Sequence, residues 1–230
     1  MAYSYSTIID VLWLDWLTPR KIIISFIGID GSGKSTVAKN LQADLTRKGI
    51  DSAYFHHSYE LIEHMPKRLR RLLGGSPILE IQSTKMNENK KNHFSLFNSL
   101  FVLLVFLDAF VTFSIERILT FTHNFIIFDR YLFDNVISFF EKSSYAGCLF
   151  FNLVPKPDMT FLLIVSAEVA YRRKGEGSIE LYEHQQMRYL DLVKNLDSSI
   201  VKVVDSNIDL GLLNTLILEN VVLSIEHKRL

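Results

Sequence analysis

The residues of this sequence that could do chemistry are concentrated first in a glycine-rich segment, GIDGSGKST, at 28–36. Its spacing, G-x-x-x-x-G-K-[S/T], is that of a phosphate-binding P-loop. Glycines let backbone N–H groups turn toward an anion, and the start of a following helix adds partial positive charge. Lys34 can reach the outer phosphates of a nucleotide, and the Ser35 hydroxyl can ligate Mg²⁺. The segment therefore predicts that ATP and Mg²⁺ are the cofactors.

The flanks of this segment decide between a nucleotide site and a glycine-rich turn that matches by coincidence. An apolar stretch at 22–27 is typical of a buried parallel strand, and 36–48 has helical spacing. Strand, loop and helix are the context that the motif requires. The residues expected to bind the nucleotide are Gly28, Asp30, Gly31, Ser32, Gly33, Lys34, Ser35 and Thr36.

A second candidate group, Asp129-Arg130-Tyr131, follows the apolar segment 125–128. An acid at the carboxyl end of such a strand, downstream of a P-loop, is the usual Mg²⁺-organising carboxylate. Arg130 can form a bidentate contact with a phosphate. Ser35 and Asp129 are thus the predicted metal ligands. The alternative is an Asp that caps a helix beside an exposed arginine.

A third group is the basic cluster Arg172-Arg173-Lys174, followed by glycines on either side of Glu176. A new helix is expected from 179 to about 196. A cationic cluster, a flexible break and a resumed helix predict a lid at about 171–180 that closes over a transferring phosphoryl group and excludes water. The alternative is a solvated charge cluster.

The elements that must position these groups alternate between strands and helices. Apolar runs predict five strands, at 22–27, 52–56, 125–129, 159–165 and 200–204. Helices are expected at 36–48, in the first part of 135–151, from 166, at 179–196 and at 210–225. This order indicates an α/β fold with a parallel sheet of about five strands. His56 and His57 end the second strand and point to opposite faces, which disfavours a shared metal and leaves an acceptor contact open.

Two further segments have open interpretations. The pattern in residues 1–20 predicts a short helix that ends at Pro19. This helix is expected either to pack as an extension on the core or on a partner, or to lie at a membrane interface. The apolar segment 94–121 is long enough for a transmembrane helix, but its uninterrupted run is only 100–107 and Asp108 follows. We favour a helix buried in the fold or in a dimer interface, in which Asp108 needs a partner.

The overall composition limits which partners and which cellular compartment are expected. The 25 basic and 25 acidic residues leave a formal net charge of zero, without the electrostatic signature of a nucleic-acid or anionic-membrane binder. The single cysteine, Cys148, gives no internal disulfide and fits a reducing compartment. The first twenty residues lack the basic start of a signal peptide. We therefore expect a cytoplasmic protein that does not act at a membrane.

These motifs together resemble the thymidylate kinase group of P-loop nucleoside-monophosphate kinases, and most nearly the thymidylate-kinase-like proteins often found in polysaccharide gene clusters. The resemblance covers about 20–225 and is weakest at 57–124. The segments that carry it are FIGIDGSGKST at 26–36, DRY at 129–131, PKPD at 155–158 and the segment 172–189. The implied division is an extension at 1–20 and a kinase domain at 21–230, with an acceptor-side region at about 57–124.

The resemblance also implies roles for individual residues. Lys34 and the loop backbone would hold the donor phosphates, Ser35 would ligate Mg²⁺ and Asp129 would organise the metal. Arg130 would meet the acceptor phosphate, and Asp30 the acceptor sugar. By the same analogy the protein is a homodimer.

The lid and the acceptor side follow the family only in part. Arg172 and Arg173 match its charge-stabilising lid arginines. The family's Arg-Glu-Pro-Gly element after the second strand is replaced by HSYE at 57–60, and its Ala-Asp-Arg by LDA at 107–109. Gly31 stands where one subclass has a loop arginine. The phosphate-donor half of the pattern is therefore intact, and the thymidylate-specific half is not.

The sequence thus predicts a three-layer α/β P-loop NTPase of the nucleoside-monophosphate-kinase type. We expect it to transfer a phosphoryl group from ATP, with Mg²⁺, to a small phosphorylated acceptor, a nucleoside monophosphate. One alternative is a nucleoside, sugar or small-metabolite kinase with a hydroxyl acceptor, for which Glu60 is a candidate base. The other is a non-catalytic nucleotide-binding module.

Overall fold

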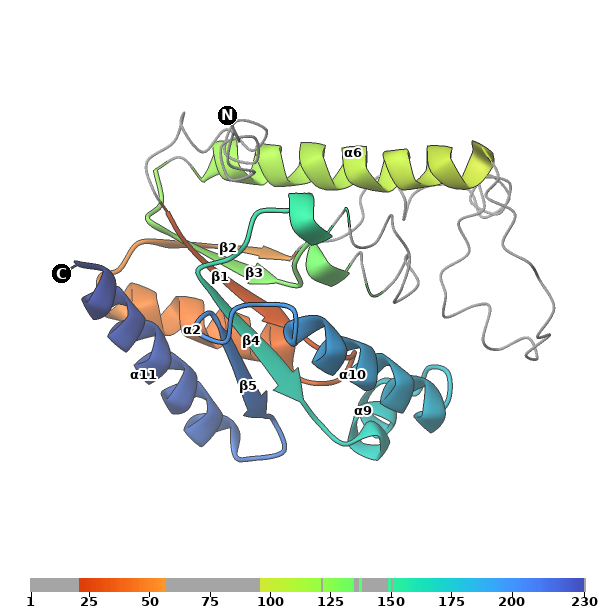
Figure 1. Ribbon diagram of the computed structural model, residues 1–230. Helices are drawn as coiled ribbons and strands as arrows, with labels where there is room; N and C mark the ends of the chain where they lie inside the picture. Colours follow the sequence, from red (N-terminus) through yellow and green to blue (C-terminus); the bar gives the residue numbers. More distant parts are fainter. Residues whose placement is uncertain are drawn as a thin grey trace. The chain divides into compact units, whose positions relative to one another are not determined.

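Five parallel strands form the sheet of this protein, whose computed structural model describes residues 21–56, 96–120, 122–134, 137, 149 and 151–229. The strands are β1 (Ile22–Ile27), β2 (Ser52–His56), β3 (Phe125–Asp129), β4 (Met159–Ile164) and β5 (Val201–Asp205). Their order is β2-β3-β1-β4-β5, and every neighbouring pair is parallel (Figure 1). The predicted α/β class and the five-stranded parallel sheet are confirmed, with strand bounds within one residue of those expected.

The chain divides into two compact units. One contains the sheet and is made of Arg20–His57, Thr122–Tyr131 and Lys156–Leu230. The other contains the helix α6 (Leu96–Leu119). Three predicted parts lie outside the described residues: the extension at 1–20, all of the acceptor-side region up to 95, and most of the helix at 135–151.

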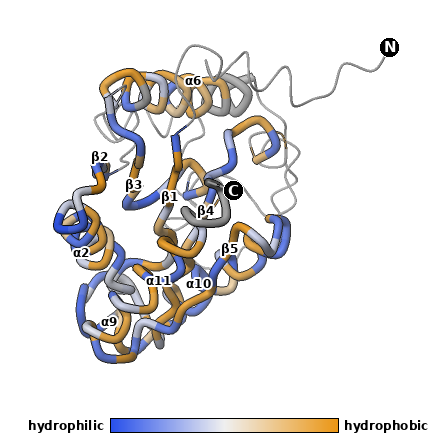
Figure 2. The backbone as a smooth tube through the Cα atoms, turned by 90° about the vertical axis from the view of Figure 1, so that its left-hand side faces the viewer, coloured by the Kyte–Doolittle hydropathy of each residue, from blue (hydrophilic) through white to orange (hydrophobic). Residues whose placement is uncertain are grey.

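Two helices cover one face of the sheet, α2 (Lys34–Arg47) and α11 (Leu210–Arg229). They lie side by side in Figure 1 and enclose a buried apolar core with β1, β3 and β4. Alternate strand residues such as Ile24 and Phe26 point into this core because side chains alternate across a strand. Apolar residues follow one another along β1 in Figure 2. Burial of this face fixes β1, and with it the loop that follows.

Side-chain hydrogen bonds link β1 to β4 and to the residue just before it, toward the amino end of the sheet. The Ile23 N–H donates to Asp158 Oδ2 at 2.8 Å, just before β4 begins. Inside the sheet the hydroxyls of Ser25 and Thr160 are 2.9 Å apart and hydrogen-bonded. Both contacts satisfy polar groups that would otherwise be buried without partners, so they fix the register of the central strands.

The basic cluster lies at the end of α9 (Ala167–Lys174), and α10 (Ile179–Val193) follows it. Gly175 ends α9 with a left-handed φ of 71°. The Ser178 hydroxyl then caps α10 by accepting from the Leu181 N–H. The expected helix, glycine break and second helix are therefore present, while the closing motion of a lid stays a prediction.

The helix α6 confirms the helix expected within 94–121, and it is orange over most of its length in Figure 2. Its Asp108 is buried, and the Thr112 hydroxyl donates to the Asp108 carboxylate at 3.5 Å. Among the described residues, no helix is long and apolar enough to cross a membrane. The apolar side chains that α6 exposes at four-residue spacing are Leu103, Leu107, Val111, Ile115 and Leu119.

Candidate functional site

The phosphate-binding loop connects β1 to α2, and its glycines adopt backbone conformations that other residues rarely reach. Gly28 has a φ of 141°, and a Cβ on it would lie 2.5 Å from the Leu163 carbonyl oxygen. Gly33 precedes α2 with a φ of 91° and provides no side-chain cap. The Ser32 hydroxyl is buried and finds no hydrogen-bond partner among the residues that the structure describes. An uncapped helix start beside a buried, unpartnered hydroxyl is suited to an anion.

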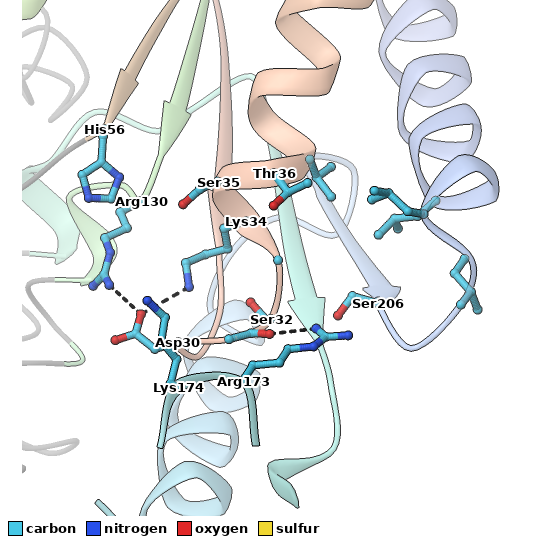
Figure 3. A pocket seen from close by; sticks show the side chains of 16 residues that line it. Asp30, Ser32, Lys34, Ser35, Thr36, His56, Arg130, Arg173, Lys174 and Ser206 are labelled. Carbon is cyan, nitrogen blue, oxygen red and sulfur yellow. Dashed lines mark hydrogen bonds and ion pairs between the residues drawn. The ribbon is translucent and has the colours of Figure 1, made fainter. Parts of the chain in front are cut away.

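Lys34 extends over the inside of this loop (Figure 3). Its ammonium group donates to the carbonyl oxygens of Gly28 and Ile29, each at 2.8 Å, and lies 3.7 Å from Asp30 Oδ1. The side chain is only 5% exposed. A buried cation therefore sits within the loop where it can exchange carbonyl oxygens for phosphate oxygens.

Asp129 ends β3 beside the loop and is fully buried. The Tyr54 hydroxyl and His56 Nδ1 lie 2.9 Å and 2.8 Å from its Oδ2 atom. Burial alone raises the pKa of Asp129, but the Ser35 hydroxyl, the hydrogen bonds from His56 and Tyr54 and the charge of His56 together hold it below its ordinary value. The pKa of Tyr54 is raised, mainly by burial and to a smaller extent by the hydrogen bond to Asp129 and its negative charge. Asp129 is thus a carboxylate and Tyr54 a donor at neutral pH.

The donor set beside the loop fits Mg²⁺. The second carboxylate oxygen of Asp129, Oδ1, is buried without a hydrogen-bond partner among the described residues. The Ser35 hydroxyl is close enough to this carboxylate to favour its ionised form. Mg²⁺ commonly takes one or two protein oxygens and completes its shell with phosphates and water. Within the described ranges no cluster of three or more His, Cys, Asp or Glu offers a protein-only cage.

Arg130 and Asp30 form an ion pair at the same end of the cavity. Arg130 Nη2 lies 2.5 Å from Asp30 Oδ1 (Figure 3). Arg130 has a φ of 73°, in the left-handed region, and its N–H donates to the Phe26 carbonyl at 3.0 Å. This conformation costs an arginine about 1 kcal/mol or more. The residue after β3 therefore turns sharply, and its guanidinium faces the loop.

The helix α9 approaches the loop closely at Gly31. A Cβ on Gly31 would lie 2.8 Å from the carbonyl oxygen of Ala170 and 3.0 Å from its Cα. Arg173 Nη1 donates to the Gly31 carbonyl oxygen at 2.8 Å. Arg173 and Lys174 line the cavity, whereas Arg172, the other predicted lid arginine, does not.

These groups surround a cavity of about 550 Å³ in the unit that contains the sheet. Its loop end is polar, and its other end is lined by Val37, Ile208, Leu210 and Leu213. The predicted residues that line it are Asp30, Gly31, Ser32, Gly33, Lys34, Ser35, Thr36, Arg130 and Arg173. Two further predicted residues do not line the cavity. Gly28 lies within the loop close to Ser32, and Asp129 contacts the Ser35 hydroxyl.

Several residues of this site were not predicted for these positions. From the sequence, His56 had an open role as an acceptor contact, and no pattern pointed to Tyr54 or to the apolar end of the cavity. Ser206, at the carboxyl end of β5, also lines the cavity and donates to the Ile164 carbonyl oxygen at 2.9 Å. Ligands of open α/β sheets bind at the carboxyl ends of the strands; that rule already indicated His56 as a candidate acceptor contact and could also have identified Ser206.

Comparison with known proteins places this site in a family. A family model described as thymidylate kinase matches residues 26–210. The matched segment includes the loop, Asp129, α9 and α10. No match was found among curated proteins.

Proposed function

The chain belongs to the thymidylate kinase family, and we propose that it is an ATP- and Mg²⁺-dependent kinase that phosphorylates a nucleoside monophosphate. One observation carries this proposal more than any other. Asp129 Oδ1, which is buried and has no hydrogen-bond partner in the described part of the chain, lies near the Ser35 hydroxyl at the start of an uncapped helix that also presents Lys34. This combination of donors suits a metal-bound polyphosphate.

The donor nucleotide would lie along the cavity from its polar end to its apolar end. The loop N–H groups and Lys34 would take the phosphates. Val37, Ile208, Leu210 and Leu213 provide an apolar surface suited to the flat face of a nucleobase. ATP is our choice of donor because it is the usual donor of the family.

Ser35 and Asp129 would hold Mg²⁺ as the family resemblance implies. When bound, the ion would neutralise charge on the phosphates. The protein's own contribution is a pair of oxygens, one from the buried carboxylate of Asp129 and one from the Ser35 hydroxyl, which lines the cavity. Asp129 stays ionised because its pKa lies below its ordinary value, for the reasons given above.

The acceptor monophosphate would meet Arg130, and its sugar would meet Asp30. In the structure these two side chains pair with each other, so acceptor binding must exchange this ion pair for contacts with the substrate. A guanidinium is well suited to a phosphate because it can donate two parallel hydrogen bonds. Because 57–60 and 107–109 depart from the family's thymidylate-binding elements, we do not specify the base of the acceptor.

In the transfer, an acceptor phosphate oxygen would form a bond to the γ-phosphorus while the bond from that phosphorus to the β-bridging oxygen breaks, which leaves ADP and a nucleoside diphosphate. The residues would act by positioning and by neutralising charge, with no covalent intermediate. Lys34 and Arg173 both donate hydrogen bonds to carbonyl oxygens of the loop, and Arg172 would join them only if α9 moves. The backbone of α9 leaves no room for a side chain at Gly31. A cation beyond Lys34 would therefore come from the lid and not from position 31 of the loop.

We also propose a homodimer that associates through α6 in a cytoplasmic location. The exposed side chains Leu103, Leu107, Val111, Ile115 and Leu119 form one row at i, i+4 spacing, a ridge that a second copy could pack against. The single cysteine fits a reducing compartment. Light scattering of the purified protein tests the dimer.

An acceptor screen tests the proposed reaction. The purified protein would be incubated with γ-³²P-labelled ATP, Mg²⁺ and a panel of nucleoside and sugar monophosphates, with nucleosides and sugars as hydroxyl acceptors. We expect a labelled nucleoside diphosphate. Label in a hydroxyl acceptor only would instead support the alternative kinase, and no transfer to any acceptor would support a non-catalytic module. Arg130→Ala should abolish transfer to a monophosphate while ATP binding remains.

A further inference from the structure

Tyr54 and His56 lie on the same face of β2, because they are separated by one residue. The strand β2 pairs in parallel with β3, and the register sets His56 opposite Asp129 and Tyr54 opposite Ile127. Two side chains from one strand therefore reach the carboxylate at the end of its neighbour. This arrangement depends on pairing between segments that are 73 or more residues apart in the chain.

Both contacts end on the same oxygen atom of Asp129. The Tyr54 hydroxyl lies 2.9 Å, and His56 Nδ1 lies 2.8 Å, from Oδ2. An ionised carboxylate only accepts hydrogen bonds, so Tyr54 donates its hydroxyl proton and His56 carries a proton on Nδ1. The other oxygen, Oδ1, is buried and has no hydrogen-bond partner among the described residues.

We propose that Tyr54 and His56 are positioning residues for the divalent-cation site, since they hold Asp129 by one oxygen and keep the other oxygen for the ion. This inference rests on the proposed function, because it takes Asp129 as a metal ligand. Hydrogen bonds to a ligating carboxylate fix its orientation, and the loss of such an outer partner typically costs about 10–100-fold in metal affinity.

A purely structural role for the pair is less consistent with its setting. A second His–Asp pair, His123 Nδ1 to Asp51 Oδ1, has the same 2.8 Å separation but lies on the surface, where both side chains are partly exposed. In contrast, the pair on Asp129 ends on a fully buried carboxylate beside the cavity, and His56 itself lines that cavity. The second pair therefore provides a matched control for loss of a His–Asp contact.

The test measures binding of Mn²⁺, a paramagnetic substitute for Mg²⁺, by electron paramagnetic resonance in the presence of a non-hydrolysable ATP analogue. Tyr54→Phe removes only the hydroxyl, and we expect it to weaken Mn²⁺ binding by about 10-fold or more. His56→Asn keeps a donor near the position of Nδ1, whereas His56→Gln moves the donor toward the position of Nε2. We expect His56→Asn to bind Mn²⁺ within about threefold of the wild type and His56→Gln to lose about 10-fold or more.

Controls separate this inference from the proposed function. His123→Asn should bind Mn²⁺ like the wild type. The variants are compared at saturating analogue, because His56 lines the nucleotide cavity and its replacement can also change binding of the analogue. Wild-type affinity in both Tyr54→Phe and His56→Gln would overturn the inference and leave the proposed function standing. A His56→Gln variant that outperforms His56→Asn would also overturn it, because His56 would then act through Nε2. Failure of the wild type to bind Mn²⁺ with the analogue would overturn the proposed function and this inference together.

Discussion

Replacement of Gly31 by alanine should force α9 away from the phosphate-binding loop. The new Cβ would lie 2.8 Å from the Ala170 carbonyl oxygen and 3.0 Å from its Cα, and both atoms belong to backbone that cannot rotate away. The φ of 82° at this position adds strain for any residue with a side chain. The left-handed conformation costs about 1–2 kcal/mol and the overpacking about 1–3 kcal/mol, so the free energy of unfolding should fall by about 2–5 kcal/mol.

Gly49→Ala provides the matched control, because Gly49 has a φ of 72° and a Cβ there would meet nothing within 4 Å. It should lose only the conformational cost, about 1–2 kcal/mol. Thermal unfolding followed by circular dichroism measures both variants, and in a domain of this size each kcal/mol lowers the melting temperature by about 2–4 °C. Gly49→Ala should keep the turnover of the wild type, whereas Gly31→Ala should lose turnover because Arg173 moves with α9.

Equal melting temperatures for the two variants would refute this reasoning. Such a result would mean that α9 does not rest against the loop in solution. The hydrogen bond from Arg173 to the Gly31 carbonyl would then be absent as well, and the assignment of Arg173 over Arg172 would lose its basis.

Three further predictions concern the lid arginines, the contact between β1 and β4, and the proposed dimer. Arg173→Ala should lower kcat by about 100-fold or more, because it removes a cation from the cavity, and Arg172→Ala should cost clearly less; equal kcat losses would contradict this. Asp158→Ala should lower the free energy of unfolding by about 1–3 kcal/mol in denaturant titration, because it leaves the Ile23 N–H unpaired; an unchanged midpoint would argue against that contact. Ile115→Glu should convert the proposed dimer into a folded monomer by light scattering, and a persistent dimer would exclude this face of α6.

Local sequence signals were sufficient for the loop and the strands. The glycine spacing at 28–36 and the apolar run before it specify a strand, a turn and a helix start within about fifteen residues. The short apolar runs at 52–56 and 125–129 likewise became β2 and β3 with the expected bounds. Asp129 was predicted as the Mg²⁺-organising carboxylate because it ends an apolar strand downstream of a P-loop.

Contacts that depend on strand order could not be predicted in the same way. The sequence does not reveal that β2 lies next to β3, so it gave no reason to expect Tyr54 and His56 on Asp129. The close approach of Ala170 to Gly31 depends on the packing of α9, which no local spacing encodes. The sequence also predicted the same role for Arg172 and Arg173, because two adjacent arginines cannot be distinguished before it is known which face of α9 lies toward the cavity.

The central claim is that the loop and Asp129 form one metal-dependent phosphoryl-transfer site. The most direct measurement is transfer of ³²P from γ-labelled ATP to a nucleoside monophosphate by the wild type and by Asp129→Asn, each with Mg²⁺ and with EDTA. We expect a labelled diphosphate from the wild type only when Mg²⁺ is present, and a loss of about 100-fold or more in Asp129→Asn. Transfer by Asp129→Asn at the wild-type rate, or wild-type transfer that persists in EDTA, would contradict this claim.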